Sequence, residues 1–85
     1  MEDPYFVYIL RCADGTLYCG ITTDLKRRVE EHNSSDRGAK YTRGRRPVEL
    51  VYSVAFEDRS QASKEEYRIK RMTREEKMKL ISSIP

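Results

Sequence analysis

Two short runs of apolar side chains near the start of the chain predict a β-hairpin. Residues 5–10 and 17–21 are rich in residues that favour strands, and a turn containing Asp14 and Gly15 separates them. Side chains alternate between the faces of a strand, so the loop length decides which residues share a face. A two-residue loop pairs odd positions with even ones, whereas a three-residue loop of Ala13, Asp14 and left-handed Gly15 pairs odd with odd.

Only the three-residue loop separates the side chains into two distinct sets. One face then holds the apolar residues Val7, Ile9, Leu17, Cys19 and Ile21. The other face holds Tyr8, Tyr18 and Gly20. A glycine inside a strand indicates that another group approaches the backbone closely. We therefore predict the bulged hairpin, with both tyrosines beside a close approach at Gly20.

A helix is predicted to follow the second strand directly, over residues 24–33. Thr23 can cap its N-terminus, and Asp24 in the first turn complements the helix dipole. Apolar side chains at i and i+4 mark its buried face. Arg28 and His32 have the same spacing and therefore project from the helix flank beside that face. A cation and an imidazole just past a glycine-bearing strand suit a phosphate site.

The next segment, residues 34–47, has no apolar period, and we call it the basic segment. It is predicted to be a structureless loop, and loops of this length are usually functional or mobile. Asp36 is its one acidic residue, against the basic residues Arg37, Lys40, Arg43, Arg45 and Arg46, with Tyr41 among them. This mixture is typical of nucleic-acid binding, and a solvated loop is an equally good interpretation.

The rest of the chain predicts one strand and two helices. Residues 48–56 alternate as a strand, with Val48, Leu50, Tyr52 and Val54 as the apolar members. Asp58 or Ser60 begins the second helix, whose inward face carries Ala62, Glu66 and Ile69. A capping box from Thr73 to Glu76 opens the third helix, whose apolar side is formed by Leu80, Ile81 and Ile84.

These elements predict a single domain over residues 1–85. The order β-β-α-β-α-α places it in the α+β class, with a small, mostly antiparallel three-stranded sheet and flanking helices. A chain of this length buries only a small core.

Charge and cysteine content exclude few functions. Seventeen Lys and Arg against fourteen Asp and Glu give a net charge of +3 and a pI near 9.0, which permits a polyanionic partner without requiring one. No apolar run could span a membrane and no signal-peptide pattern is present, so we expect a cytoplasmic protein. Cys12 and Cys19 lack CxxC spacing, which argues against zinc and favours free thiols.

Each candidate functional residue also has a structural interpretation. From spacing alone, Glu66 is more often a carboxylate paired with an arginine at the core margin than a metal ligand. Arg28 adjoins two other cations and would ordinarily be solvated, and a lone histidine such as His32 is usually packed. Tyr8 and Tyr18 are ordinary strand residues by propensity.

Taken together, however, these residues resemble a known family. Val7-Tyr8-Ile9, Tyr18-Cys19-Gly20 and Leu25-Lys26-Arg27-Arg28, followed by a helical glutamate, are similar to the motifs of GIY-YIG nuclease domains. The resemblance covers almost the whole chain and is closest to the small stand-alone bacterial members. Phe6-Val7 and Cys19 depart from the motif letters, and no Asn follows Glu66 as in some larger relatives.

The resemblance implies cleavage of phosphodiesters in nucleic acid with one divalent ion, Mg²⁺ or Mn²⁺. Tyr18 would be the general base or would orient the attacking water, and Tyr8 would help to position it. Arg28 would stabilise charge on the phosphate, Glu66 would hold the metal, and His32 would be auxiliary. Gly20 would leave room for a substrate backbone.

The substrate expected from the resemblance is DNA rather than RNA, in repair or recombination, and the expected state is a monomer. Two alternatives stay open. One is a nucleic-acid-binding module that keeps the fold with little or no catalysis. The other is a small interaction protein whose basic segment meets an acidic protein.

Overall fold

The computed structural model describes residues 4–34 and 37–83 and contains one antiparallel three-stranded sheet. Its strands are β1 (Tyr5–Arg11), β2 (Leu17–Thr22) and β3 (Glu49–Phe56). The strand order is β2-β1-β3, so the first strand is central and pairs with both neighbours. Four consecutive residues of this strand, Val7, Tyr8, Ile9 and Leu10, are all buried.

The hairpin has the predicted three-residue loop. The N–H of Cys12 donates to the carbonyl of Thr16 at 2.8 Å, and Gly15 has a φ of +86°, in the left-handed region. The register pairs Tyr8 with Gly20 and therefore odd positions with odd ones. This confirms the predicted separation of the apolar face from the face of the two tyrosines.

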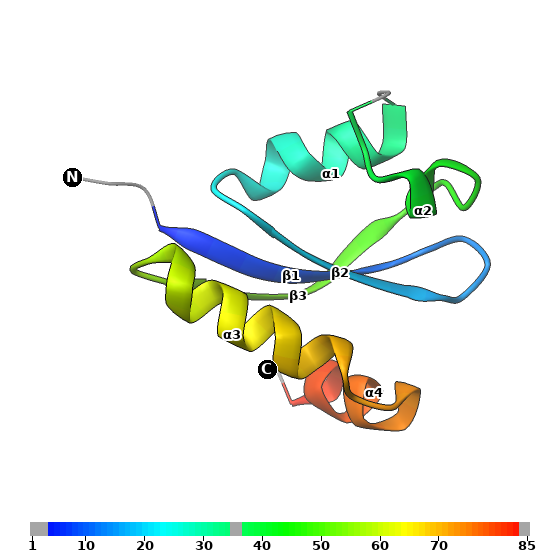
Figure 1. The fold of residues 1–85 in the computed structure, drawn as a ribbon. Coiled ribbons are helices and arrows are strands. Elements are labelled where there is room, and N and C mark those ends of the chain that lie inside the picture. The colour runs from blue at the N-terminus through cyan, green and yellow to red at the C-terminus, as the bar shows by residue number, and fades with distance from the viewer. Residues whose placement is uncertain (1–3, 35–36, 84–85) are drawn as a thin grey trace.

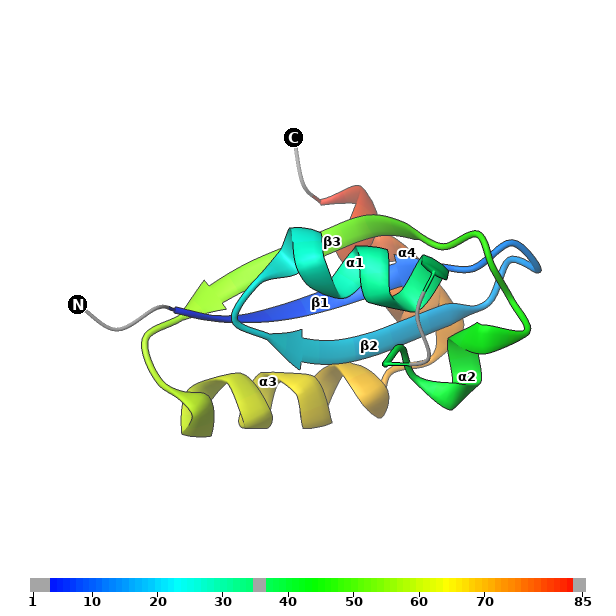
Figure 2. The ribbon, with the colours of Figure 1, turned by 90° about the horizontal axis from the view of Figure 1, so that it is seen from above.

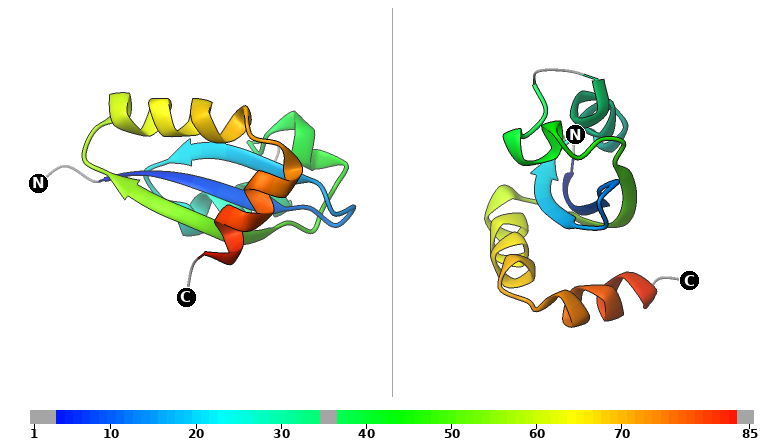
Figure 3. Two further views of the ribbon diagram at one scale, coloured as in Figure 1. Left: turned by 90° about the horizontal axis from the view of Figure 1, so that it is seen from below. Right: turned by 90° about the vertical axis from the view of Figure 1, so that its right-hand side faces the viewer.

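Helices cover both faces of the sheet. They are α1 (Leu25–Ser34), α2 (Lys40–Arg43), α3 (Arg59–Lys70) and α4 (Arg74–Ser82). α1 and α2 lie on one face, and α3 and α4 lie on the other (Figures 1 and 3). The predicted α+β class and element order are confirmed, with the short α2 as an addition.

Two apolar clusters fill the two layers. On the side of α3 and α4, Val7, Ile9 and Cys19 pack with Ala62 and Ile69. On the side of α1, the cluster consists of Tyr8, Leu10, Cys12 and Val48, against which Tyr18, Leu25 and Val29 pack. Both cysteines are buried free thiols. The buried residues of the first layer are all apolar, whereas the second layer contains Tyr8 and Tyr18.

The helix caps agree with the sequence except at α1. Asp24, not Thr23, caps this helix, because its carboxylate accepts the N–H of Arg27 at 3.0 Å. Asp58 caps α3, and the capping box of Thr73 and Glu76 is present. Leu80 and Ile81 pack on the apolar layer as predicted, and Ile84 lies outside the described residues.

The third strand does not keep the even alternation predicted for it. Ile9 pairs with Tyr52 but Leu10 pairs with Leu50, so Val51 is an extra residue in a β-bulge. Because of the extra residue, even-numbered side chains lie on one face of the sheet before the bulge and on the other face after it. Tyr52 therefore packs in the α3 layer, whereas Val48 packs in the α1 layer.

The described part of the basic segment, residues 37–47, is ordered by contacts, so the prediction of a structureless loop is wrong. Asn33 at the end of α1 donates to the carbonyl of Val48 at 3.0 Å and accepts its N–H at 2.7 Å. The N–H of Ala13 donates to the carbonyl of Arg45 at 2.9 Å. Polar bonds to distant residues hold this segment, which is why no apolar period marks it. Asp36 lies outside the described residues.

Within the residues that the structure describes, no helix has the length and apolar character needed to cross a membrane.

Candidate active site

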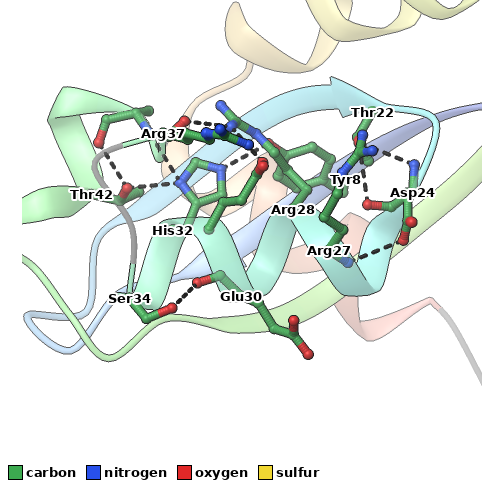
Figure 4. Close-up of polar contacts among 12 residues, drawn as sticks. Tyr8, Thr22, Asp24, Arg27, Arg28, Glu30, His32, Ser34, Arg37 and Thr42 are labelled. Atoms are coloured by element: carbon green, nitrogen blue, oxygen red, sulfur yellow. Dashed lines mark hydrogen bonds and ion pairs between the residues drawn. The ribbon is translucent and has the colours of Figure 1, made fainter.

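A buried hydrogen-bonded chain lies between the sheet and α1. The hydroxyl of Tyr8 is 2.9 Å from Nε2 of His32, and Nδ1 of His32 is 2.8 Å from Oγ1 of Thr42. Tyr8 is 1% exposed, and His32 and Thr42 are 0% exposed. In Figure 4, His32 projects from α1 between the tyrosine of β1 and the threonine of α2. This hydrogen-bonded chain of side chains thus joins β1, α1 and α2, which are distant in sequence.

The bond made by Thr42 decides the tautomer of His32. The Thr42 hydroxyl donates its one proton to the carbonyl of Ala39 at 2.9 Å. Toward His32 it can therefore only accept, so Nδ1 carries the ring proton and donates to Thr42. Nε2 is left as an acceptor, and the Tyr8 hydroxyl donates to it. The N–H of Ala39 lies 3.4 Å from Nδ1, a much longer contact.

Burial keeps both groups uncharged. Burial, together with the positive charge of Arg28, lowers the pKa of His32 from 6.5 to about 4. Burial raises the pKa of Tyr8 from 10.0 to about 12, although a hydrogen bond with Arg28 opposes the rise. At neutral pH this site therefore contains a neutral imidazole and a neutral phenol.

Arg28 supplies the fixed charge of the site. Its guanidinium donates to the carboxylate of Glu31 at 3.1 Å and to the carbonyl of Arg37 at 2.7 Å. Burial alone would lower the pKa of Arg28, but hydrogen bonds with Tyr8 and Glu31 raise it overall. Arg28 and His32 therefore both project from the same flank of α1, as predicted. Arg28 is not a solvated surface arginine.

Tyr18 lies next to the buried chain and is more accessible than Tyr8. Its ring centroid is 6.5 Å from that of Tyr8 and 5.2 Å from that of His32. Tyr41 stacks on it at 5.8 Å, and Arg45 covers the other side of Tyr41 at 4.1 Å. Within the described residues the Tyr18 hydroxyl makes no hydrogen bond, so it is available to water or a substrate.

Gly20 is close to a side chain of the protein itself. A Cβ atom at Gly20 would lie 2.5 Å from the hydroxyl oxygen of Tyr8 and 2.8 Å from its ring. The close approach predicted from the sequence is therefore made by Tyr8, and this space is filled. Gly20 lets the phenol lie flat enough against β2 to reach His32.

Glu66 lies apart from the other candidates. It belongs to α3, on the opposite face of the sheet, and its carboxylate pairs with Lys70 at 3.3 Å instead of with an arginine. Its side chain is 25% exposed. Burial and the Glu66 charge raise the pKa of Cys19 to about 11, which indicates that the carboxylate is near β2. α3 runs beside the β2 edge of the sheet (Figure 2).

The residues predicted to contact nucleic acid are largely engaged with the protein. Arg45 pairs with Asp14 at 3.0 Å and donates to the carbonyl of Tyr41 at 2.7 Å. Arg46 donates to the carbonyl of His32 at 2.5 Å. Arg37 and Arg43 have interactions as well, whereas Lys40 and Tyr41 are exposed. Nucleic-acid binding by these residues stays a prediction.

Thr42 and Asn33 are the site residues that sequence reasoning missed. Thr42 sets the histidine tautomer, and Asn33 joins α1 to the start of β3. Nothing in the local sequence indicates either role, since each depends on a partner in another element.

Comparisons with known proteins agree with this fold. Residues 4–79 match the model of the GIY-YIG catalytic domain. The UPF0213 protein of Desulfotalea psychrophila is 58% identical over 82 residues, which are 96% of this chain and 74% of that protein. A UPF0213 protein of Staphylococcus aureus is 53% identical over 79 residues, covering 93% of this chain and 95% of that one.

Two solution NMR structures are similar in fold. The UPF0213 protein from Bacillus halodurans has a TM-score of 0.63 and 46% identity, over 95% of this chain and 85% of that one. A protein from E. faecalis has a TM-score of 0.66 and 40% identity, over 96% and 86%. Because one family model spans most of the chain and such similar relatives extend along nearly all of it, this chain belongs to the GIY-YIG catalytic domain family of nucleases.

Proposed function

We propose that this protein hydrolyses phosphodiester bonds in nucleic acid, with DNA as substrate and repair or recombination as its setting. The observation that carries the proposal is the cluster of Tyr8, His32 and Arg28 with Tyr18 beside it. A charged guanidinium, a buried hydrogen-bonded phenol and a second, accessible phenol suit a reaction in which negative charge develops on a phosphate.

Arg28 would bind the scissile phosphate. One nitrogen of its guanidinium, Nη1, donates to both Glu31 and the carbonyl of Arg37, so the group would need little rearrangement as charge develops. The planar fork of an arginine also matches phosphate oxygens in geometry.

The two tyrosines would have different roles. Burial raises the pKa of Tyr8 to about 12 and lowers the pKa of His32 to about 4, so the phenol keeps its proton and the imidazole stays neutral at pH 7. In the substrate-free protein Tyr8 is therefore a neutral positioning group. Tyr18, with its open hydroxyl, is the better candidate to orient or deprotonate the attacking water.

Glu66 fits a role as the single protein ligand of a divalent ion. A partly exposed carboxylate with a flexible lysine partner suits Mg²⁺ or Mn²⁺, because magnesium keeps most of its waters and takes other oxygens from the substrate. When bound, the ion would add positive charge that stabilises the anionic transition state. No group of three or more His, Cys, Asp or Glu residues suited to a metal occurs among the described residues, so the substrate would complete the site.

The alternative is a binding module with the nuclease fold and no turnover. The observation in its favour is that Glu66 is paired with Lys70 and belongs to α3, whereas the other candidates belong to β1, β2 and α1.

Incubation with plasmid DNA, branched DNA and RNA, with Mg²⁺ or Mn²⁺, tests the proposal. We expect Glu66→Gln to abolish metal-dependent cleavage while the free energy of unfolding changes by less than about 0.5 kcal/mol, since a partly exposed i,i+4 pair contributes little. Lys70→Gln breaks the same ion pair but keeps the carboxylate, and Glu65→Gln removes a neighbouring carboxylate that pairs with Arg68.

These two control variants should keep metal-dependent cleavage. Equal loss of cleavage in Glu66→Gln and Lys70→Gln would assign the effect to the ion pair and overturn the metal role. If the wild-type protein binds nucleic acid but leaves all three substrates intact with both metals, the binding module is the correct function.

A further inference from the structure

An open groove of about 310 Å³ lies at one end of the molecule, beside the candidate active site. It is bordered by the end of β2, the first turn of α1 and the start of α3. Arg27 and Arg28 line it from α1, and Arg59 lines it from α3. Arg28 also contacts Tyr8, so the groove and the Tyr8–His32 chain share this residue.

Arg27 and Arg59 differ from the other arginines of the chain. Neither side chain makes a hydrogen bond or ion pair with another residue, as judged over residues 4–34 and 37–83. Every other arginine has such an interaction, whether in the basic segment or at distant sites such as Arg11 with Glu49 and Arg68 with Glu65. The two arginines without an internal partner thus line the same groove.

The placement of both residues also runs against helix electrostatics. Arg27 is in the first turn of α1 and Arg59 is the first residue of α3. The acidic caps of these helices, Asp24 and Asp58, accept backbone N–H groups and make no ion pair with the two guanidinium groups. A cation at a helix N-terminus is unfavourable by about 0.3–1 kcal/mol because of the helix dipole. Side chains that break a local rule without a compensating contact mark a functional position.

We infer that this groove binds the phosphodiester backbone of a nucleic-acid strand, next to the phosphate held by Arg28, through Arg27 and Arg59. The inference rests on the proposed function and extends it by assigning the path of the substrate. Glu31 is the one acidic residue of the groove, and its charge is matched by Arg28. Neither Arg27 nor Arg59 has an acidic partner among the lining residues, and a concave surface focuses their field on an anionic ligand.

The test is binding of a fluorescent DNA duplex, measured by anisotropy over a range of salt concentrations without divalent ions. The variant is Arg27→Ala/Arg59→Ala. The control is Arg68→Ala/Arg71→Ala, which removes the same charge from α3 where both arginines have internal partners. Each lost phosphate contact should lower the slope of log Kd against log salt by about 0.9, so we expect a decrease of about 1.8 for the groove variant and none for the control.

Thermal unfolding separates this role from a structural one. Because the groove arginines oppose the helix dipoles, the groove variant should melt at the wild-type temperature or slightly above it while binding weakens. Arg27→Lys/Arg59→Lys keeps the charge and should keep the salt slope.

Three results would overturn the inference. An unchanged slope in the groove variant, with normal wild-type binding, would refute the groove and leave the nuclease proposal intact. If the wild-type protein does not bind the DNA duplex, both the groove inference and the nuclease proposal are refuted. Competition by poly-glutamate that equals competition by unlabelled DNA and depends on the same arginines would show a surface for any polyanion.

Discussion

At the scale of single residues, the most consequential feature is an imidazole buried between two hydroxyl groups. His32 accepts a hydrogen bond from the Tyr8 hydroxyl at Nε2 and donates one from Nδ1 to Thr42, so both nitrogens are satisfied only in the neutral form. Protonation would place a second donor against a hydroxyl that already donates and would add a charge near Arg28. Folding therefore favours the neutral ring.

This arrangement predicts that acid destabilises the protein through His32. The pKa is about 4 in the folded state and about 6.5 in the unfolded chain, so the unfolded state binds the proton first as pH falls. Stability present above pH 6.5 should be lost toward pH 4, by about 3 kcal/mol. Urea unfolding at pH 7 and pH 4 measures this loss, and His32→Gln should lose about 3 kcal/mol less. Equal losses in the two proteins would contradict the prediction.

At the scale of elements, the hairpin is the part that could be predicted from sequence with its register. Only one loop length puts all five apolar residues on one face, and the face of the tyrosines follows from it. The bulge in β3 was not predicted, because the even positions from Val48 to Val54 are all apolar and Val51 becomes an extra residue only against β1.

The remainder of the site depends on contacts between elements. α2 and Thr42 could not be predicted, because the bonds that hold them join residues far apart in sequence and leave no period. The position of Glu66 likewise depends on which face of the sheet α3 covers. The sequence predicts the inward side of the helix for Glu66, whose side chain is 25% exposed, but it could not assign that face.

Two glycines provide a matched test of the hairpin. Gly15 has a φ of +86°, whereas Gly44 has a φ of −92° and open space around it. Gly15→Ala should lower the free energy of unfolding by about 1–2 kcal/mol because an L side chain disfavours the left-handed region. Gly44→Ala should raise it by about 0.4–1 kcal/mol, since alanine restricts the unfolded chain without strain in the fold. Urea unfolding of both variants decides the matter, and effects of the same sign would refute the assigned loop.

At the scale of the whole molecule, the sheet divides two tasks between its faces. The buried residues of the layer under α3 and α4 are all apolar, whereas the layer under α1 contains the hydrogen-bonded chain of Tyr8, His32 and Thr42. β1 contributes to both layers from adjacent residues, because neighbouring side chains of a strand point to opposite faces. Ile9 packs in the first layer and Tyr8 in the second.

Substitutions at these two neighbours should therefore separate stability from chemistry. Ile9→Val removes one methylene from the apolar layer and should cost about 1 kcal/mol, or roughly 4–8 °C in Tm, while cleavage per folded molecule stays at the wild-type rate. Tyr8→Phe leaves Nε2 of His32 without its donor and removes the hydroxyl that contacts Arg28, so cleavage should fall by about 100-fold or more. Thermal unfolding measures the Tm of each variant, and cleavage is measured at a temperature where each variant is folded. Cleavage by Tyr8→Phe at the wild-type rate would exclude the buried hydrogen-bonded chain from the active site.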